Sequence, residues 1–286
     1  MSEIVICHGI GYQYKHRETA LTEWYGELRA GMMDTAVRVP SPHQVSAVYY
    51  GNCYRSQGGK SSIGEDEFAD IPMLRPGDVR NPTEQALLEA LAEGLGTSDP
   101  HTKGLTQWAV RRLEASPELG RPPSRLVIWL VRQVYRYLDK NDTVRACALQ
   151  RFERVVTPAT RVVIGHSLGS IIAYEALCAH PEWNVDTFIT LGSPLGISLV
   201  RERLRPRVLA DGNREWPNVA RWINVAAKED PIALVKRLAP FFGDAVEDRL
   251  VVNAGLSRFI LGGHSVLRYL TTSEVAEGVA DALDRG

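Results

Sequence analysis

The chain carries six short apolar runs, separated by longer stretches in which polar and apolar positions are mixed. Each run is rich in β-branched or aromatic residues and nearly free of charge, which is typical of a strand buried on both faces. We predict one strand in each run, at residues 3–7, 45–51, 160–165, 185–192, 220–227 and 248–253.

Between these runs, apolar positions recur at the spacing of an amphipathic helix. We predict helices at 17–32, 83–95, 168–179 and 273–284. Strands that alternate with helices favour right-handed crossovers and a mainly parallel sheet with helices on both faces. The predicted fold class is therefore α/β.

The C-terminal helix has the clearest pattern. Thr271 and Glu274 have the spacing of a capping box, in which two side chains bond the first free backbone N–H groups. Val275, Val279 and Leu283 then follow on one face. We expect this face to be buried.

One interval is far longer than a single crossover needs. Residues 52–80 are rich in glycine, serine, proline and charge, which indicates a loop, whereas 81–156 predict several helices. The longest apolar helical stretch, 124–140, belongs to this part. We interpret 1–286 as a single domain with a largely helical insertion at 52–150, which forms a cap or covers a sheet edge.

Composition limits the partners. The formal net charge is −1, so no strong field draws the chain to nucleic acid or to anionic lipid. No apolar run approaches the length of a membrane span, and a strand-like run so close to the start argues against a signal peptide. The four cysteines, Cys7, Cys53, Cys147 and Cys178, are scattered and are interpreted as reduced thiols. We expect a cytoplasmic protein without integral membrane association; its oligomeric state stays open.

Candidate chemistry begins at Gly165-His166-Ser167-Leu168-Gly169, between the predicted strand "RVVI" and the predicted helix "LGSIIAYEAL". A serine at such a turn is held in strained backbone angles, and its hydroxyl projects above the sheet. The flanking glycines allow the strand and helix to approach closely. Ser167 is the candidate nucleophile, because this turn also aims the Leu168 N–H at a developing negative charge. The alternative is a turn in which the serine only caps the helix.

A serine hydroxyl needs a base. Of seven histidines, only His264, in "LGGHSVLRYL", follows the last predicted strand. The others precede the serine turn, lie beside the serine, or end the following helix: His8, His16, His43, His101, His166 and His180. His264 is the candidate base; the alternative is a histidine in a surface loop.

The base needs an acid to orient it. Asp230 follows the strand "WINVAA", and Pro231 biases it to an extended conformation. Glu229 is its nearest rival, with Asp211 and Asp244 as weaker ones. The order Ser167, Asp230, His264 is the nucleophile–acid–base order of a known group of hydrolases.

The last component is an oxyanion hole. "HGIG" follows the first strand, so the N–H groups of Ile10 and Gly9 could join that of Leu168. The candidates for substrate contacts are His8, His166 and Trp129. Trp129 belongs to an aromatic stripe with Tyr135 and Tyr137 that could line an acyl pocket or simply be core.

At "HGIG", "GHSLGS", "DPI" and "GGHS" the chain resembles the α/β-hydrolase superfamily, in its lipase and esterase branch. The resemblance covers 1–51 and 157–286. The serine turn is also similar to that of intracellular phospholipases that prefer phosphatidic acid, although their Asp-Asp-His-Asp motif is not found here. The resemblance implies hydrolysis of an ester, thioester or amide through an acyl-enzyme, without a metal or organic cofactor.

The leading hypothesis is a serine esterase acting on a small-molecule or lipid-like ester of a hydrophobic or bulky acyl group. An acyltransferase, a thioesterase or a peptidase could use the same three residues. A binding module with little turnover on the same scaffold is the alternative from another class, because a fold alone does not fix function.

Overall fold

The computed structural model describes residues 2–12, 15–54, 72–94, 105–117, 121–206, 208–209, 212, 214–253 and 262–285. Within them, a single six-stranded sheet has the order β2-β1-β3-β4-β5-β6, and all neighbouring strands are parallel. The strands are β1 (Ile4–Cys7), β2 (Val45–Val48), β3 (Val162–His166), β4 (Thr187–Leu191), β5 (Arg221–Ala227) and β6 (Val246–Val251). The predicted parallel α/β sheet is confirmed, with small shifts at the strand ends.

The last strand departs from the prediction of burial on both faces. β6 lies at the edge of the sheet and pairs only with β5. Arg249 is exposed and Leu250 is 53% exposed, and among the described strands β6 has a neighbour on one side only. The apolar run in the sequence looks like that of a central strand. It does not indicate which strands lie beside it in the sheet, so its position at the edge could not be predicted.

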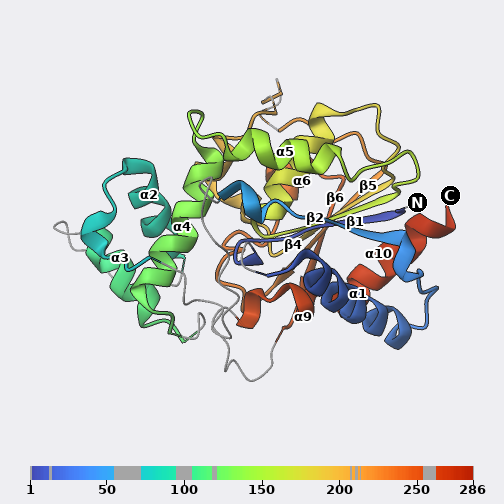
Figure 1. The fold of residues 1–286 in the computed structure, drawn as a ribbon, viewed down its shortest axis with the longest axis horizontal. Coiled ribbons are helices and arrows are strands. Elements are labelled where there is room, and N and C mark those ends of the chain that lie inside the picture. Colours follow the sequence, from blue (N-terminus) through green and yellow to red (C-terminus); the bar gives the residue numbers. More distant parts are fainter. Residues whose placement is uncertain are drawn as a thin grey trace.

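Helices cover both faces of the sheet (Figure 1). One face packs on α1 (Arg17–Asp34), α9 (Val266–Leu270) and α10 (Ser273–Asp284). The other face packs on α5 (Val144–Glu153) and α6 (Leu168–Ala179). Successive residues of each strand alternate between these two cores, as the two-residue period of a strand requires.

The predicted face of the C-terminal helix is buried, but its predicted cap is wrong. Val275, Val279 and Leu283 lie in the core. The helix is capped by Thr272 rather than Thr271, and no side chain bonds its first N–H groups. Both threonine hydroxyls instead donate to carbonyls of the preceding helix α9. That helix ends too close to α10 for the capping box to form.

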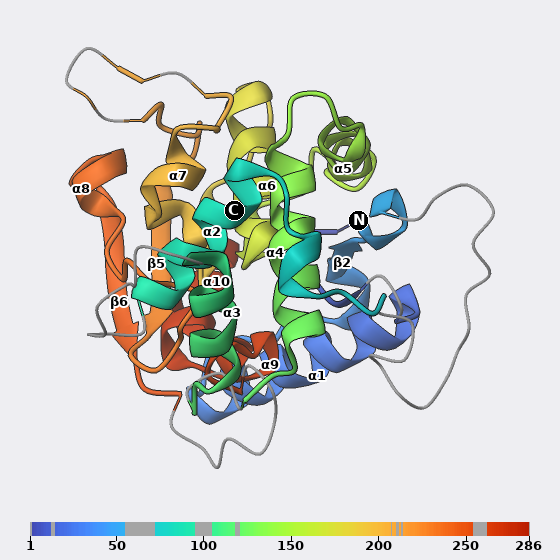
Figure 2. The same cartoon turned by 90° about the vertical axis from the view of Figure 1, so that its left-hand side faces the viewer.

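Three further helices come between β2 and β3: α2 (Pro82–Glu93), α3 (Leu105–Glu114) and α4 (Ser124–Leu138). They lie beyond the carboxyl ends of the strands, as Figures 1 and 2 show from two sides. The predicted helices of the insertion are thus present, together with α5. Most of the predicted loop 52–80 falls at 55–71, outside the described residues. The short helices α7 (Ser198–Arg201) and α8 (Ala239–Phe242) follow β4 and β5.

A buried ion pair joins the inserted segment to helix α6. Arg145 of α5 and Glu175 of α6 form a two-pronged pair, and their side chains are 2% and 1% exposed. The hydroxyl of Tyr137, in α4, donates to the same carboxylate at 2.7 Å. A buried pair is tolerated only when its remaining polar atoms are satisfied, and here Arg145 also donates to the Arg203 carbonyl.

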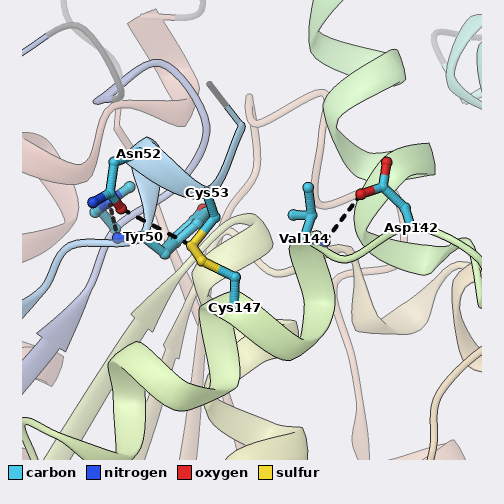
Figure 3. Close-up of a disulfide and its surroundings, with 7 residues drawn as sticks. Tyr50, Asn52, Cys53, Asp142, Val144 and Cys147 are labelled. Carbon is cyan, nitrogen blue, oxygen red and sulfur yellow. Dashed lines mark hydrogen bonds between the residues drawn. A yellow bond between two sulfur atoms is a disulfide. The ribbon is translucent and has the colours of Figure 1, made fainter. Parts of the chain in front are cut away.

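A disulfide joins Cys53, just after β2, to Cys147 of α5 (Figure 3). The expectation of four reduced thiols is therefore wrong for these two, whereas Cys7 and Cys178 are free. Residues 94 apart in sequence meet here because α5 packs beside the short helical turn that contains Cys53. Disulfides persist mainly in oxidising compartments, so the cysteines no longer support the cytoplasmic expectation, which stays untested.

None of the described helices is both long enough and apolar enough to cross a lipid bilayer.

Candidate active site

Ser167 occupies a strained turn between β3 and α6. Its backbone angles are φ 52° and ψ −127°, a region that residues other than glycine rarely adopt. A Cβ atom at Gly169 would lie 2.3 Å from the carbonyl oxygen of Cys7, so α6 reaches the end of β1 only because this residue is glycine. The sequence-based interpretation of this turn agrees with the geometry: the serine stands at the carboxyl edge of the sheet.

His264 and Asp230 meet at the same edge. His264 ends a short helical turn at Gly262–His264, and Asp230 follows β5. The His264 Nδ1 lies 2.8 Å from Asp230 Oδ2, and both side chains are buried. When the neutral imidazole donates Nδ1–H to the carboxylate, its Nε2 is left as the acceptor. This is the tautomer that a general base for Ser167 needs.

The Asp230 carboxylate is surrounded by donors. Its Oδ1 accepts the backbone N–H groups of Ile232 at 2.8 Å and Ala233 at 3.2 Å. Its Oδ2 accepts the hydroxyl of Tyr269 at 2.6 Å as well as the imidazole. Burial raises the pKa of Asp230, but the charge of His264 and these hydrogen bonds outweigh it and lower the pKa to about 2. Asp230 is therefore ionised throughout the neutral range.

Two other buried histidines, His8 and His166, are neutral in the neutral pH range. Burial lowers the pKa of His8 to about 4, against the effect of its hydrogen bond to the Gly9 carbonyl. Burial and the charge of His264 lower the pKa of His166 to about 3. The His166 Nε2–H donates to the His264 carbonyl at 2.8 Å. The residue beside the candidate nucleophile thus holds the backbone of the candidate base.

The candidate oxyanion donors lie around Ser167. Leu168 is the first residue of α6, where a backbone N–H has no acceptor within the helix. Cys7 pairs with Gly165 in the sheet, which brings the segment after β1 beside the serine turn. A Cβ atom at Gly9 would accordingly lie 2.9 Å from the Ser167 Cβ. Ile10 lines the pocket described next, and the assignment of Ile10, Gly9 and Leu168 as donors stays a prediction.

Ser167 and His264 line one pocket of about 80 Å³. A water-sized group needs about 10–15 Å³ of such space, so the pocket has room for several. Its remaining walls are aliphatic and come from α2, α4 and the segments after β4 and β5, with Leu87, Leu91, Leu130, Val134, Ile197 and Ile232 among them. Among the described residues that line the pocket, His264 alone has a titratable side chain of the Asp, Glu, His, Lys or Arg kind.

The three proposed substrate contacts lie elsewhere. His8 is fully buried and stacks on Tyr50, with ring centroids 4.1 Å apart. His166 is turned toward the His264 loop. Trp129 packs with Leu126 in a separate apolar cluster, while its neighbour Leu130 faces the pocket. Helix α4 contributes Leu130, Val131 and Val134 to the pocket, and the role of the insertion as a cap stays a prediction.

Of the rival acids, Glu229 turns away and accepts the Asn253 N–H at 3.2 Å. Asp211 lies outside the described residues, and Asp244 follows α8 rather than the strand end. Sequence reasoning missed Tyr269. Its place in "HSVLRYL" indicates only a core position on a short helix, and no sequence signal reveals its bond to Asp230.

Among the described residues, no three or more His, Cys, Asp or Glu side chains form a group that could hold a metal ion. The chain matches no protein-family model, no curated protein and no solved structure. The functional argument therefore rests on the geometry of the site.

Proposed function

We propose that this protein is a serine hydrolase with an α/β-hydrolase architecture, and that it cleaves esters of aliphatic acyl groups. One observation carries the proposal: Ser167, on a strained turn, shares an apolar pocket with His264, whose ring is bonded to the buried carboxylate of Asp230. A capping serine would not require a base beside it, and a surface histidine would not be buried against an ionised acid.

The residues have distinct roles in the proposed reaction. Ser167 Oγ attacks the ester carbonyl while His264 Nε2 takes its proton, and the resulting oxyanion is held by backbone N–H groups. His264 then returns the proton to the departing alcohol, which leaves an acyl-enzyme. A water molecule gives its proton to His264, attacks the acyl carbon and releases the acid, and Ser167 regains its proton. Asp230 stays ionised and stabilises each imidazolium.

The walls of the pocket indicate which part of the ester enters it. An aliphatic lining offers no partner for a charged or strongly polar group, whose burial would go uncompensated. The acyl chain therefore occupies the pocket between α2 and α4, and the alcohol leaves toward solvent. On this proposal the insertion 52–150 acts as a cap that selects the acyl group. None of the three residues that carry out the chemistry belongs to it.

A fluorophosphonate probe tests the nucleophile. We expect one label per chain in the wild type and none in Ser167→Ala. Ser273→Ala is the matched control, because Ser273 is exposed on α10 and does not line the pocket. Label retained in Ser167→Ala would refute the assignment.

A panel of p-nitrophenyl esters of increasing acyl length then tests the reaction. His264→Ala should lose about as much activity as Ser167→Ala, because such residues act as a unit. Glu229→Gln should reduce esterase activity far less than Asp230→Asn. The reverse result would show that Asp230 is not the acid that orients His264.

A further inference from the structure

Tyr269 touches the same carboxylate oxygen as the candidate base. Its hydroxyl donates to Asp230 Oδ2 at 2.6 Å, and His264 Nδ1 lies 2.8 Å from that same atom. The other carboxylate oxygen is already taken by the backbone of Ile232 and Ala233. The phenol therefore acts on the one oxygen through which Asp230 influences His264.

We propose that Tyr269 is a positioning residue that sets the proton affinity of His264 by sharing the negative charge of Asp230 Oδ2. The inference rests on the proposed function of Ser167, Asp230 and His264. Tyr269 acts through the Asp230 carboxylate and does not line the pocket that Ser167 and His264 share.

The phenol is held firmly for this task. Tyr269 is fully buried in α9, and its oxygen also accepts the Ala227 N–H at 2.9 Å. That bond comes from the last residue of β5, so the strand end fixes the oxygen on one side while Asp230 fixes it on the other. Burial and the neighbouring Asp230 charge raise the pKa of Tyr269 far above its ordinary value. The hydroxyl therefore stays protonated at neutral pH and donates to Asp230.

The backbone of Gly192 packs against the side chains of Asp230, His264 and Tyr269. With φ +52°, its backbone lies directly against all three side chains: a Cβ there would be 2.5 Å from Asp230 Oδ2 and 3.0 Å from both His264 Nδ1 and Tyr269 Cε2. No side chain larger than hydrogen fits at this point. The acid, the base and the phenol are therefore packed as one unit around the end of β4.

Charge sharing has a definite sign. A carboxylate oxygen that already accepts a strong hydrogen bond attracts a second positive group less strongly, so the phenol weakens the stabilisation of the His264 imidazolium. Without the phenol, the imidazolium is stabilised more and His264 keeps its proton to higher pH. Other ionisable groups around this pair are His166, whose ring centroid lies 4.6 Å from that of His264, and Lys236, whose ammonium donates to the Asp230 carbonyl. The charge of His8 acts on His166, and the charge of Glu229 acts on Lys236 and Tyr269.

The first test is the pH profile of kcat/KM in Tyr269→Phe. We expect the acidic limb, which reports the base of the free enzyme, to move to higher pH by about one unit. A shift of that size means about ten-fold lower kcat/KM at a fixed pH below the limb. Tyr174→Phe is the matched control: it removes another buried hydroxyl, bonded to the Glu215 carbonyl at 2.6 Å, and should leave the limb in place.

A second variant keeps the packing intact. Replacement of Tyr269 by 3-fluorotyrosine makes the phenol a stronger donor at nearly the same size, so the limb should move to lower pH, opposite to Tyr269→Phe. If neither change moves the limb, or if both move it in the same direction, the proposed role is wrong.

A third measurement does not depend on turnover. In Ser167→Ala protein, the His264 imidazole can be titrated by NMR, with its signal assigned by loss in His264→Gln. Its midpoint should rise when Tyr269→Phe is added. An unchanged midpoint refutes the charge sharing even if the protein proves not to be a hydrolase, whereas probe labelling of Ser167 tests the hydrolase proposal alone.

Discussion

On the proposed function, Leu130→Ala should lengthen the acyl chain of the preferred ester substrate. Leu130 is half-buried on α4 and lines the pocket that Ser167 and His264 share. Truncation to alanine removes three carbon atoms from the wall of a space of about 80 Å³. Each extra methylene that the substrate can bury is worth about 0.8 kcal/mol, or about four-fold in kcat/KM. An acyl group longer by two carbons should therefore gain about fifteen-fold relative to the wild type.

Leu126→Ala is the matched control on the same helix. Leu126 is only 1% exposed, packs with Trp129 and does not line the pocket. Its truncation should cost about 2–5 kcal/mol of unfolding free energy, because a buried cavity is left behind. Truncation of the half-buried Leu130 should lower the unfolding free energy by less. The two variants thus separate specificity from stability. Leu130→Ala should change the dependence of kcat/KM on acyl length, whereas Leu126→Ala should mainly lower the urea midpoint of unfolding.

The assay is kcat/KM across a series of straight-chain p-nitrophenyl esters, with urea unfolding measured in parallel. If Leu130→Ala leaves the acyl profile unchanged while labelling of Ser167 persists, the pocket does not hold the acyl chain. If Leu126→Ala shifts the profile equally, α4 acts through general loosening and the insertion has to be called structural.

Three further predictions follow from the same geometry. Gly192→Ala should abolish activity, whereas Gly243→Ala, which has φ +108° but open space around its Cβ, should cost stability and leave turnover intact; equal activity in both would refute the packing argument. Asp230, with its pKa lowered to about 2, stabilises the fold above its ordinary pKa of about 3.9, and this stability is lost as pH falls toward 2. The difference in unfolding free energy between wild type and Asp230→Asn should thus shrink by about 2 kcal/mol from about pH 5 to about pH 2; a constant difference would contradict it. The double substitution of Cys53 and Cys147 by serine should cost about 4–5 kcal/mol of unfolding free energy, since the bridge spans 94 residues; reduced wild type should match it, and equal stability of oxidised and reduced protein would disprove it.

Much of the sheet and of the site could be predicted from the sequence because both depend on local pattern and chain order. Apolar runs identify parallel strands, and the carboxyl ends of such strands meet at one edge. Residues that follow separate strands are therefore expected to converge. Ser167, Asp230 and His264 were selected in this way, and the structure brings all three to that edge.

What sequence could not predict depends on contacts between distant segments. Trp129 and Leu130 are adjacent on α4 but point about 100° apart, so only the packed helix shows which one reaches the pocket. Cys53 and Cys147 give no motif, because their pairing follows from how α5 sits beside the end of β2. Tyr269 has the pattern of an ordinary core residue, and its bond to Asp230 spans 39 residues.

The packing of α1 against α9 and α10 has a consequence for how the protein is made. Trp24, Leu28 and Met32 of α1 are fully buried, and their core includes residues of both C-terminal helices (Figure 1). In a nascent chain on the ribosome, this face of α1 therefore stays partly uncovered until residues 266–284 emerge. The same segment delivers Tyr269 and is preceded closely by His264, so on the proposed function the site and the covered face of α1 are completed together. Chains released before residue 266 should expose this apolar face, and we expect chaperones to take them up.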